Sequence, residues 1–147
     1  DASFELILMS ADESVSRFEV ESWRTIVEQD ASGDVRTEAT VKVRANGERM
    51  ISTAEGNGPV NALDKALRSA VTSLHPELEP LELIDYKVRI LGWRGGTSAT
   101  TRVLVDTTDG VGEWTTVGVH ANIVEASWHA LVDAMTYAVL RRPSSTD

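Results

Sequence analysis

Two short stretches of the chain could hold a small charged ligand with backbone groups alone. The first, residues 56 to 63, reads GNGPVNAL and stands where an alternating pattern gives way to a helical one. Amides at the start of a helix have no partner within the helix, and with the helix dipole they favour an anion such as a carboxylate. Gly56 and Gly58 leave room for a ligand or another backbone, and Pro59 suits the first helical position. A tight corner and a ligand site both explain this stretch.

The second stretch, residues 118 to 122, reads GVHAN and again leads from a strand pattern into a helix pattern. We expect this corner, like the first, to offer unpaired backbone N–H groups. If the two halves of the chain are related by a pseudo-twofold axis, the two corners should face one another near that axis and form a cleft. The pairing makes the ligand interpretation as strong as the packing interpretation, and both stay open.

Other patterns that could carry chemistry are weaker. His75, His120 and His129 show no metal-ligand spacing, and Ser, His and Asp occur in no nucleophile-elbow context. The chain has no cysteine, which excludes thiolate metal sites and cysteine nucleophiles. Residues 106 to 110, DTTDG, resemble part of a calcium loop but lack its length and closing Glu, so a hairpin turn is expected. We therefore predict no catalytic residue, no metal site and no cofactor in these residues.

Length and charge narrow the class of protein. With 147 residues and 41% apolar residues the chain fits one compact domain. Its 14 Lys and Arg against 23 Asp and Glu give a net charge of -9, which argues against nucleic acid and anionic membrane surfaces as partners. No apolar run is long enough to span a bilayer, and the absence of cysteine suits the cytoplasm. The chain begins without Met, and we interpret it as a segment of a longer, cytoplasmic protein.

Alternating apolar residues predict six strands in two groups of three. The first group covers residues 18–27, 37–45 and 48–56, with Asn46-Gly47 as a hairpin turn between the last two. The second group covers residues 83–91, 100–106 and 113–119, with Asp109-Gly110 at the second turn. In residues 83–91 the residues expected to point inward are Ile84, Tyr86, Val88 and Ile90, and those expected to point outward are Asp85, Lys87 and Arg89.

Each group of strands is followed by a helical pattern. An apolar face with helical spacing is formed by Val60, Leu63, Ala66, Leu67, Ala70, Val71 and Leu74. A second helix is expected over residues 122–140, with an alanine row at Ala126, Ala130, Ala134 and Ala138. Val41 and Val103, Val43 and Val105, and Gly56 and Gly118 are each 62 residues apart, whereas Ala66 and Ala130 are 64 apart. The spacing indicates a duplication.

The predicted fold is therefore α+β, a duplicated βββα unit with pseudo-twofold symmetry in which two three-stranded sheets are each packed by a helix. We expect residues 1–16 to end a linker from a longer enzyme, residues 17–142 to form the domain with repeats 17–75 and 81–142, and residues 143–147 to be a tail. Double-stranded RNA-binding domains share the strand and helix order, but the first helix has no basic cluster. One helix on each sheet leaves apolar area uncovered, so a homodimer is also expected, with Trp114 and Trp128 in the core or at subunit contacts.

Several segments together resemble one known family. Residues 53–68 (TAEGNGPVNALDKALR), 83–91 (LIDYKVRIL), 97–106 (TSATTRVLVD) and 114–137 (WTTVGVHANIVEASWHALVDAMTY) are similar to the carboxy-terminal regulatory domain of 2-isopropylmalate synthases and citramalate synthases. The resemblance is closest to citramalate synthases and runs from Phe18 to Leu140. As a set these motifs are far more specific than one glycine corner.

The resemblance implies a non-catalytic module that dimerises and binds the end-product amino acid, with isoleucine favoured and leucine next, for feedback inhibition in branched-chain amino-acid biosynthesis. Catalysis, an acetyl-CoA-dependent acyl transfer to a 2-keto acid, would lie in a barrel with a divalent metal outside these residues. That barrel would be a partner of this domain. The alternatives are a purely structural dimerisation module with no ligand and an enzyme in its own right.

The resemblance also implies which residues hold the effector. The two corners would bind its ammonium and carboxylate through Gly56, Asn57, Gly58, Pro59, Val60, Val119, His120, Ala121 and Asn122. The pocket for its side chain would be shaped by Leu83, Asp85, Tyr86 and Ile90. Because His120 and Asn122 stand where leucine-binding members usually have small residues, the identity of the effector stays open.

Overall fold

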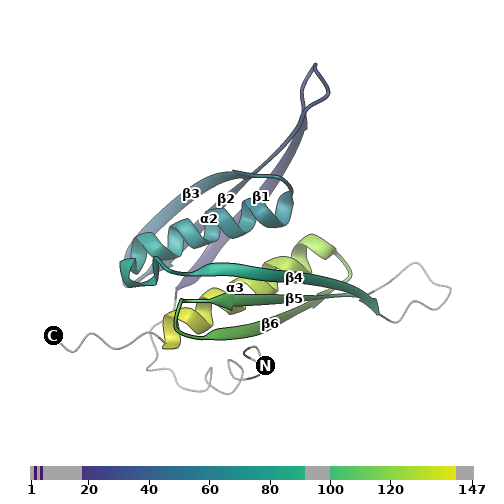
Figure 1. The fold of residues 1–147 in the computed structure, drawn as a ribbon. Helices are drawn as coiled ribbons and strands as arrows, with labels where there is room; N and C mark the ends of the chain where they lie inside the picture. Colours follow the sequence, from purple (N-terminus) through teal and green to yellow (C-terminus); the bar gives the residue numbers. More distant parts are fainter. Residues whose placement is uncertain (1, 3, 5–17, 92–99, 142–147) are drawn as a thin grey trace. The chain divides into compact units, whose positions relative to one another are not determined.

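The computed structural model describes residues 2, 4, 18–91 and 100–141 and divides into two compact units (Figure 1). We call Phe18–Leu74 the first repeat and the described residues from His75 onward the second repeat. Each repeat is a three-stranded antiparallel sheet followed by a helix, so the predicted α+β fold with a duplicated βββα unit is confirmed. Among the described residues, no helix combines the length and the apolar character needed to cross a membrane.

The first repeat contains β1 (Glu19–Gln29), β2 (Val35–Ala45), β3 (Glu48–Gly56) and α2 (Pro59–Leu74). The central strand β2 buries every second residue, and α2 packs mainly on β2 and β3. Between sheet and helix lies an apolar core that includes Val41, Val43, Leu63, Leu67 and Val71. Asn46 and Gly47 have φ angles of 50° and 80°, as a two-residue hairpin of this hand requires.

The second repeat contains a short 3-10 helix η1 (Pro76–Leu78), β4 (Glu82–Leu91), β5 (Thr100–Thr108), β6 (Glu113–His120) and α3 (Ile123–Arg141). Helix α3 packs on β5 and β6 through its buried alanine row. The indole of Trp114 donates a hydrogen bond of 3.1 Å to the Ala134 carbonyl, and the Arg141 guanidinium lies 4.9 Å from the centre of the Trp114 ring. The end of α3 is therefore held onto β6 by both apolar and polar contacts.

The turn at residues 109–112 is a hairpin loop organised by one carboxylate. The amides of Val111 and Gly112 both donate to Asp109 Oδ1 at 2.9 Å, and Gly110 has a φ of 89°. The expected hairpin turn is confirmed, because β5 and β6 pair as far as Thr108 and Glu113 and the Asp109 carboxylate accepts amides inside the loop.

Two details of the predicted sheets are wrong. A bulge between Leu83 and Asp85 leaves Ile84 without a partner on β5, and Ile84 is 43% exposed instead of pointing inward. Gly56 is also not the counterpart of Gly118. Val41 and Val103 are equivalent residues of the two central strands, and Val103 pairs with Gly118 whereas Val41 pairs with Ser52. The longer loop at residues 109–112 shifts β6 relative to β3, so Ser52 is the structural equivalent of Gly118.

Candidate functional site

The two glycines of the first corner lack side chains for different reasons. A Cβ atom on Gly56 would lie 2.5 Å from the Ala62 nitrogen, so close packing of α2 on β3 requires glycine there. A Cβ atom on Gly58 would meet no atom within 4 Å among the described residues, and Gly58 does not have a positive φ. Packing therefore explains Gly56, while the space beside Gly58 is open to a ligand.

The start of α2 leaves backbone donors available. Gly58 is the N-cap, since its carbonyl accepts the Ala62 amide at 3.0 Å, and Pro59 has no amide hydrogen. The Asn61 side chain accepts from the Asn57 amide at 3.1 Å and so closes the corner. Among the described residues no side chain accepts from the first-turn amides of Val60 or Asn61, and no acidic residue lies in the first turn. The first corner thus has the donors that a carboxylate needs.

Asp64, one turn further along α2, is a candidate that the sequence analysis missed. Its side chain is only 7% exposed, its Oδ2 lies 3.4 Å from the Arg68 guanidinium, and its Oδ1 has no hydrogen-bond partner in the described structure. Burial raises the pKa of this carboxyl, against the opposing effect of Arg68 and Lys65. A buried carboxylate oxygen without a donor is costly unless a ligand supplies one. Asp64 therefore offers an acceptor for an ammonium group.

At the second corner, side chains accept the backbone N–H groups that were expected to be unpaired. The expectation is therefore wrong for this corner. Asn122 is the N-cap of α3, and its Oδ1 accepts the amides of Val124 at 2.9 Å and Glu125 at 3.1 Å. His120 Nδ1 accepts the Asn122 amide at 2.9 Å. Because Nδ1 accepts, the neutral ring carries its proton on Nε2, which lies 3.1 Å from Glu125 Oε2. Asn122 and His120 satisfy the donors that a ligand was expected to use.

The predicted side-chain pocket residues on β4 lie on two faces of the sheet. Leu83, Tyr86 and Ile90 pair with inward-facing positions of β5 and share its helix side, whereas Asp85 pairs with Asp106 on the opposite face. Tyr86 is tied to α3 by a hydrogen bond of 2.9 Å between its hydroxyl and Ser127 Oγ. Helix α3 covers β5 and β6, and the helix side of β4 stays partly open, with Ile90 66% exposed. One pocket on the helix side can use the first three residues and not the Asp85 side chain.

Each predicted corner stays together within its own repeat. Residues 56–60 form the end of β3 and the start of α2, and residues 119–122 link β6 to α3. Val119 itself points to the outer face of its sheet, since it pairs with Arg102, and it is 51% exposed. The expectation that the two corners face one another stays a prediction. The described residues contain no group of three His, Cys, Asp or Glu that could hold a metal ion.

Comparisons with known proteins agree on one family. Residues 1–139 match the family model described as the LeuA allosteric (dimerisation) domain. The chain is 58% identical over 143 residues to an (R)-citramalate synthase of Streptomyces coelicolor, which covers 96% of this chain and 27% of that protein. It is 54% identical over 101 residues to an (R)-citramalate synthase of Synechocystis, covering 69% of this chain and 18% of that protein.

A relative with another name lies further away. A 2-isopropylmalate synthase of Aquifex aeolicus is 36% identical over 104 residues, covering 71% of this chain and 18% of that protein. The chain thus spans about a quarter or less of the length of these relatives. With the family match over nearly the whole chain and the βββα duplication, the chain belongs to the LeuA allosteric (dimerisation) domain family.

Proposed function

We propose that this chain is the regulatory part of a citramalate synthase and that it binds a branched-chain amino acid, isoleucine before leucine, for feedback inhibition. The observation that carries the proposal is the pair of complementary groups at the start of α2. Open amides at Val60 and Asn61 suit a carboxylate, and the buried Asp64 Oδ1, which has no partner in the described structure, suits an ammonium. An amino acid carries both groups on adjacent atoms.

The geometry of α2 supports one ligand that uses both ends. One helical turn, about 5.4 Å, separates residues 60 and 64, which is the scale of an amino acid's charged head. Gly58 leaves space beside this turn, as no described atom lies within 4 Å of where its Cβ would be. Leu83, Tyr86 and Ile90 stay a separate proposal for the branched side chain, because this row of β4 is apolar apart from one hydroxyl and Ile90 is exposed.

The parent enzyme is part of the proposal, because this chain covers 27% of the Streptomyces coelicolor relative. Two relatives are named (R)-citramalate synthase, and both share more identity with this chain than the 2-isopropylmalate synthase does. This order favours citramalate synthesis over 2-isopropylmalate synthesis for the parent. Self-association to a homodimer is proposed with it, since the family model is that of a dimerisation domain.

Thermal melting of the 147-residue chain with and without isoleucine, leucine and valine tests the effector proposal. A ligand that binds only the folded state at a hundred times its Kd adds about 2.7 kcal/mol of stability, so the Tm should rise by several degrees. Isoleucine should give the largest shift. If none of the three amino acids shifts the Tm, the effector proposal fails, and a purely structural dimerisation module remains.

Two variants of one residue test the site. Gly58→Asp places a carboxylate where the ligand's carboxylate belongs and should abolish the shift, whereas its melting without ligand should stay close to that of the parent chain, because Asp is a good N-cap. Gly58→Ala adds a Cβ but no hydrogen-bond acceptor and is the matched control, so it should keep most of the shift. If Gly58→Asp keeps the full shift, the first corner is structural and the assignment of the site is wrong.

A further inference from the structure

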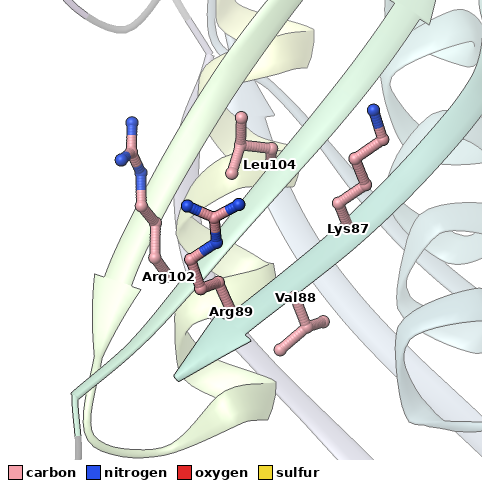
Figure 2. Close-up of a pocket in the computed structure, with 5 residues that line it drawn as sticks. All are labelled: Lys87, Val88, Arg89, Arg102 and Leu104. Atoms are coloured by element: carbon pink, nitrogen blue, oxygen red, sulfur yellow. The ribbon is translucent and has the colours of Figure 1, made fainter. Parts of the chain in front are cut away.

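The outer face of the second sheet, opposite α3, carries its charges in an unusual order. Along β5 this face presents Arg102, Leu104 and Asp106, and the register with β4 places Arg89 beside Arg102 and Asp85 beside Asp106. The face thus has an Arg–Arg pair at one end and an Asp–Asp pair at the other, with Lys87 and Leu104 between them. A hollow of about 450 Å³ lies at the basic end and is lined by Lys87, Arg89, Arg102 and Leu104 of this face together with Val88 of β4. Figure 2 shows these five side chains as sticks.

Both outer pairs are unfavourable within a single copy of the chain. Like charges directly opposite on neighbouring strands destabilise a sheet. Neither Arg89 nor Arg102 has an ion pair among the described residues, whereas Arg141 of the same repeat pairs with Asp109. Asp85 is partly compensated by Lys87 at 3.5 Å, and Asp106 accepts the Thr115 hydroxyl at 2.5 Å. Among the described residues, the two arginines therefore have no anionic partner.

The third strand adds an apolar strip to the middle of this face. Val117 pairs with Leu104, and Val119 pairs with Arg102 on β6. Leu104 and Val117 are half-buried, and Val119 is 51% exposed. Apart from Lys87, the centre of this face is apolar and lies between a basic and an acidic end. Such an order suits a surface that contacts itself, because an isologous contact brings the same patch of two copies together.

We propose that this face binds the same face of a second copy of the chain about a twofold axis that runs across the strands at Leu104. The axis lies in the plane of contact and inverts the order of residues along each strand. It therefore places Arg102 against Asp106 of the other copy and Arg89 against Asp85. Leu104 then meets Leu104, and Lys87, which pairs with Leu104 on β4, meets Lys87. Within one copy like charges are neighbours, and across the two copies each arginine meets a carboxylate, with the bidentate geometry that guanidinium groups favour.

A single cysteine placed on the proposed axis tests the contact directly, because the chain has none of its own. In the 147-residue chain, Leu104→Cys should be linked to a second copy by a short bismaleimide that spans about 10 Å, the spacing of two stacked sheets. Lys42→Cys is the matched control, since it lies 62 residues earlier on the outer face of the first sheet. The Leu104→Cys variant should link on the order of tenfold faster than the Lys42→Cys variant, and its linking should slow as salt screens the charges.

Exchange of the charges at residues 102 and 106 tests the proposed order of residues across the axis. In the Leu104→Cys background, Arg102→Glu and Asp106→Arg should each slow the linking on the order of tenfold, because each puts like charges across the axis. The chain with both changes should regain the rate, since residues 102 and 106 again carry opposite signs across the contact. Circular dichroism of each variant should show that it is folded. Single changes without effect, or a double change that fails to restore the rate, would overturn the proposal.

The assignment of this face rests on the proposed self-association, and the two can fail separately. Light scattering that finds only monomer at micromolar concentrations would remove the homodimer and this contact with it. A Leu104→Cys variant that is a dimer by light scattering but does not link would leave the homodimer standing and show that another face forms it.

Discussion

The two strand-to-helix corners occupy the same place in the two repeats but cap their helices in opposite ways. At α3 the cap is complete, with Asn122 accepting two amides and His120 accepting the amide of Asn122. At α2 the cap is a glycine, and no side chain of the described residues accepts from the first-turn amides. The duplicated unit therefore closes one corner with side-chain caps and leaves the first-turn amides of the other without a side-chain acceptor among the described residues.

The same contrast continues one turn into each helix. Helix α2 buries an alanine row at Ala62, Ala66 and Ala70, and helix α3 buries the matching row at Ala126, Ala130 and Ala134. This offset of 64 residues makes Trp128 the counterpart of Asp64, and both are buried at 5% exposure. One helix uses the position for apolar packing, whereas the other buries a carboxylate whose Oδ1 has no partner in the described structure. The second repeat thus has an apolar side chain at the position where the first repeat has a buried carboxylate.

Substitution of Gly118 should produce the largest effect on stability. A Cβ atom at this position would overlap the Ala126 carbonyl oxygen and approach the Ala130 nitrogen at 2.9 Å, and neither backbone group can move without separating α3 from β6. Gly118→Ala should lower the free energy of unfolding by about 3 kcal/mol or more. Urea denaturation followed by circular dichroism measures this loss.

Gly58→Ala is the control for this prediction, because a Cβ at Gly58 has no described neighbour within 4 Å. Its cost should stay within about 1 kcal/mol, the difference between glycine and alanine at an N-cap. Equal losses for the two variants would show that the open and the closed glycine do not differ in packing, and the comparison of the corners would lose its basis.

The sequence was sufficient for the elements and insufficient for the details that distinguish the repeats. Alternation and the Asn46-Gly47 turn predicted the strands, since both signals are local. The bulge at Ile84 adds one residue with no turn signal, so the phase of β4 could not be read from the pattern. The burial of Asp64 depends on packing and has no local signal. The cap at Asn122 could have been predicted, because an Asn three residues before Glu125 is typical of a helix start.

Asp64→Asn should weaken the binding of isoleucine and so test whether the buried carboxylate of α2 contacts the effector. The variant keeps the shape of the side chain and loses the charge that would meet the ligand's ammonium, so isoleucine should bind about tenfold more weakly, a loss of about 1.4 kcal/mol. Calorimetric titration of the folded chain with isoleucine measures the change. An unchanged Kd would mean that this carboxylate does not contact the effector.

The pH dependence of binding gives an independent check on Asp64. Burial raises the pKa of this carboxyl above its ordinary value of 3.8, so the folded chain holds the proton more tightly than the unfolded chain. Ionisation of Asp64 therefore costs stability as the pH rises from 3.8 through the raised pKa. Isoleucine needs the ionised form, so its affinity should fall as the pH falls through the raised pKa, and Asp64→Asn should lack this dependence.

Removal of the cap at the closed corner should have a moderate effect. Asn122→Ala leaves the amides of Val124 and Glu125 without their acceptor and should lower the free energy of unfolding by about 1 kcal/mol. The thermal shift with isoleucine should be kept, because the proposed charged contacts lie on α2. Loss of the shift in a folded Asn122→Ala variant would place the effector at the second corner and reverse the assignment.

The smallest effect is expected at the longer hairpin of the second repeat. Burial acts to raise the pKa of Asp109, but hydrogen bonds from the Gly112 and Val111 amides and the charge of Arg141 outweigh it and hold the pKa below 3.8. The stability from this carboxylate is thus present above pH 3.8 and lost as the pH falls through the lowered pKa. Asp109→Asn keeps an acceptor for the turn and loses only the pair with Arg141, so it should cost about 0.5 kcal/mol at neutral pH, as a partly exposed pair does. Urea denaturation of both chains across the acid range should show this difference closing once the parent carboxyl is protonated. A difference that persists there would assign the loss to the geometry of the turn and not to the charge, and the hairpin at Asn46-Gly47, which needs no carboxylate, would then differ from it in loop length alone.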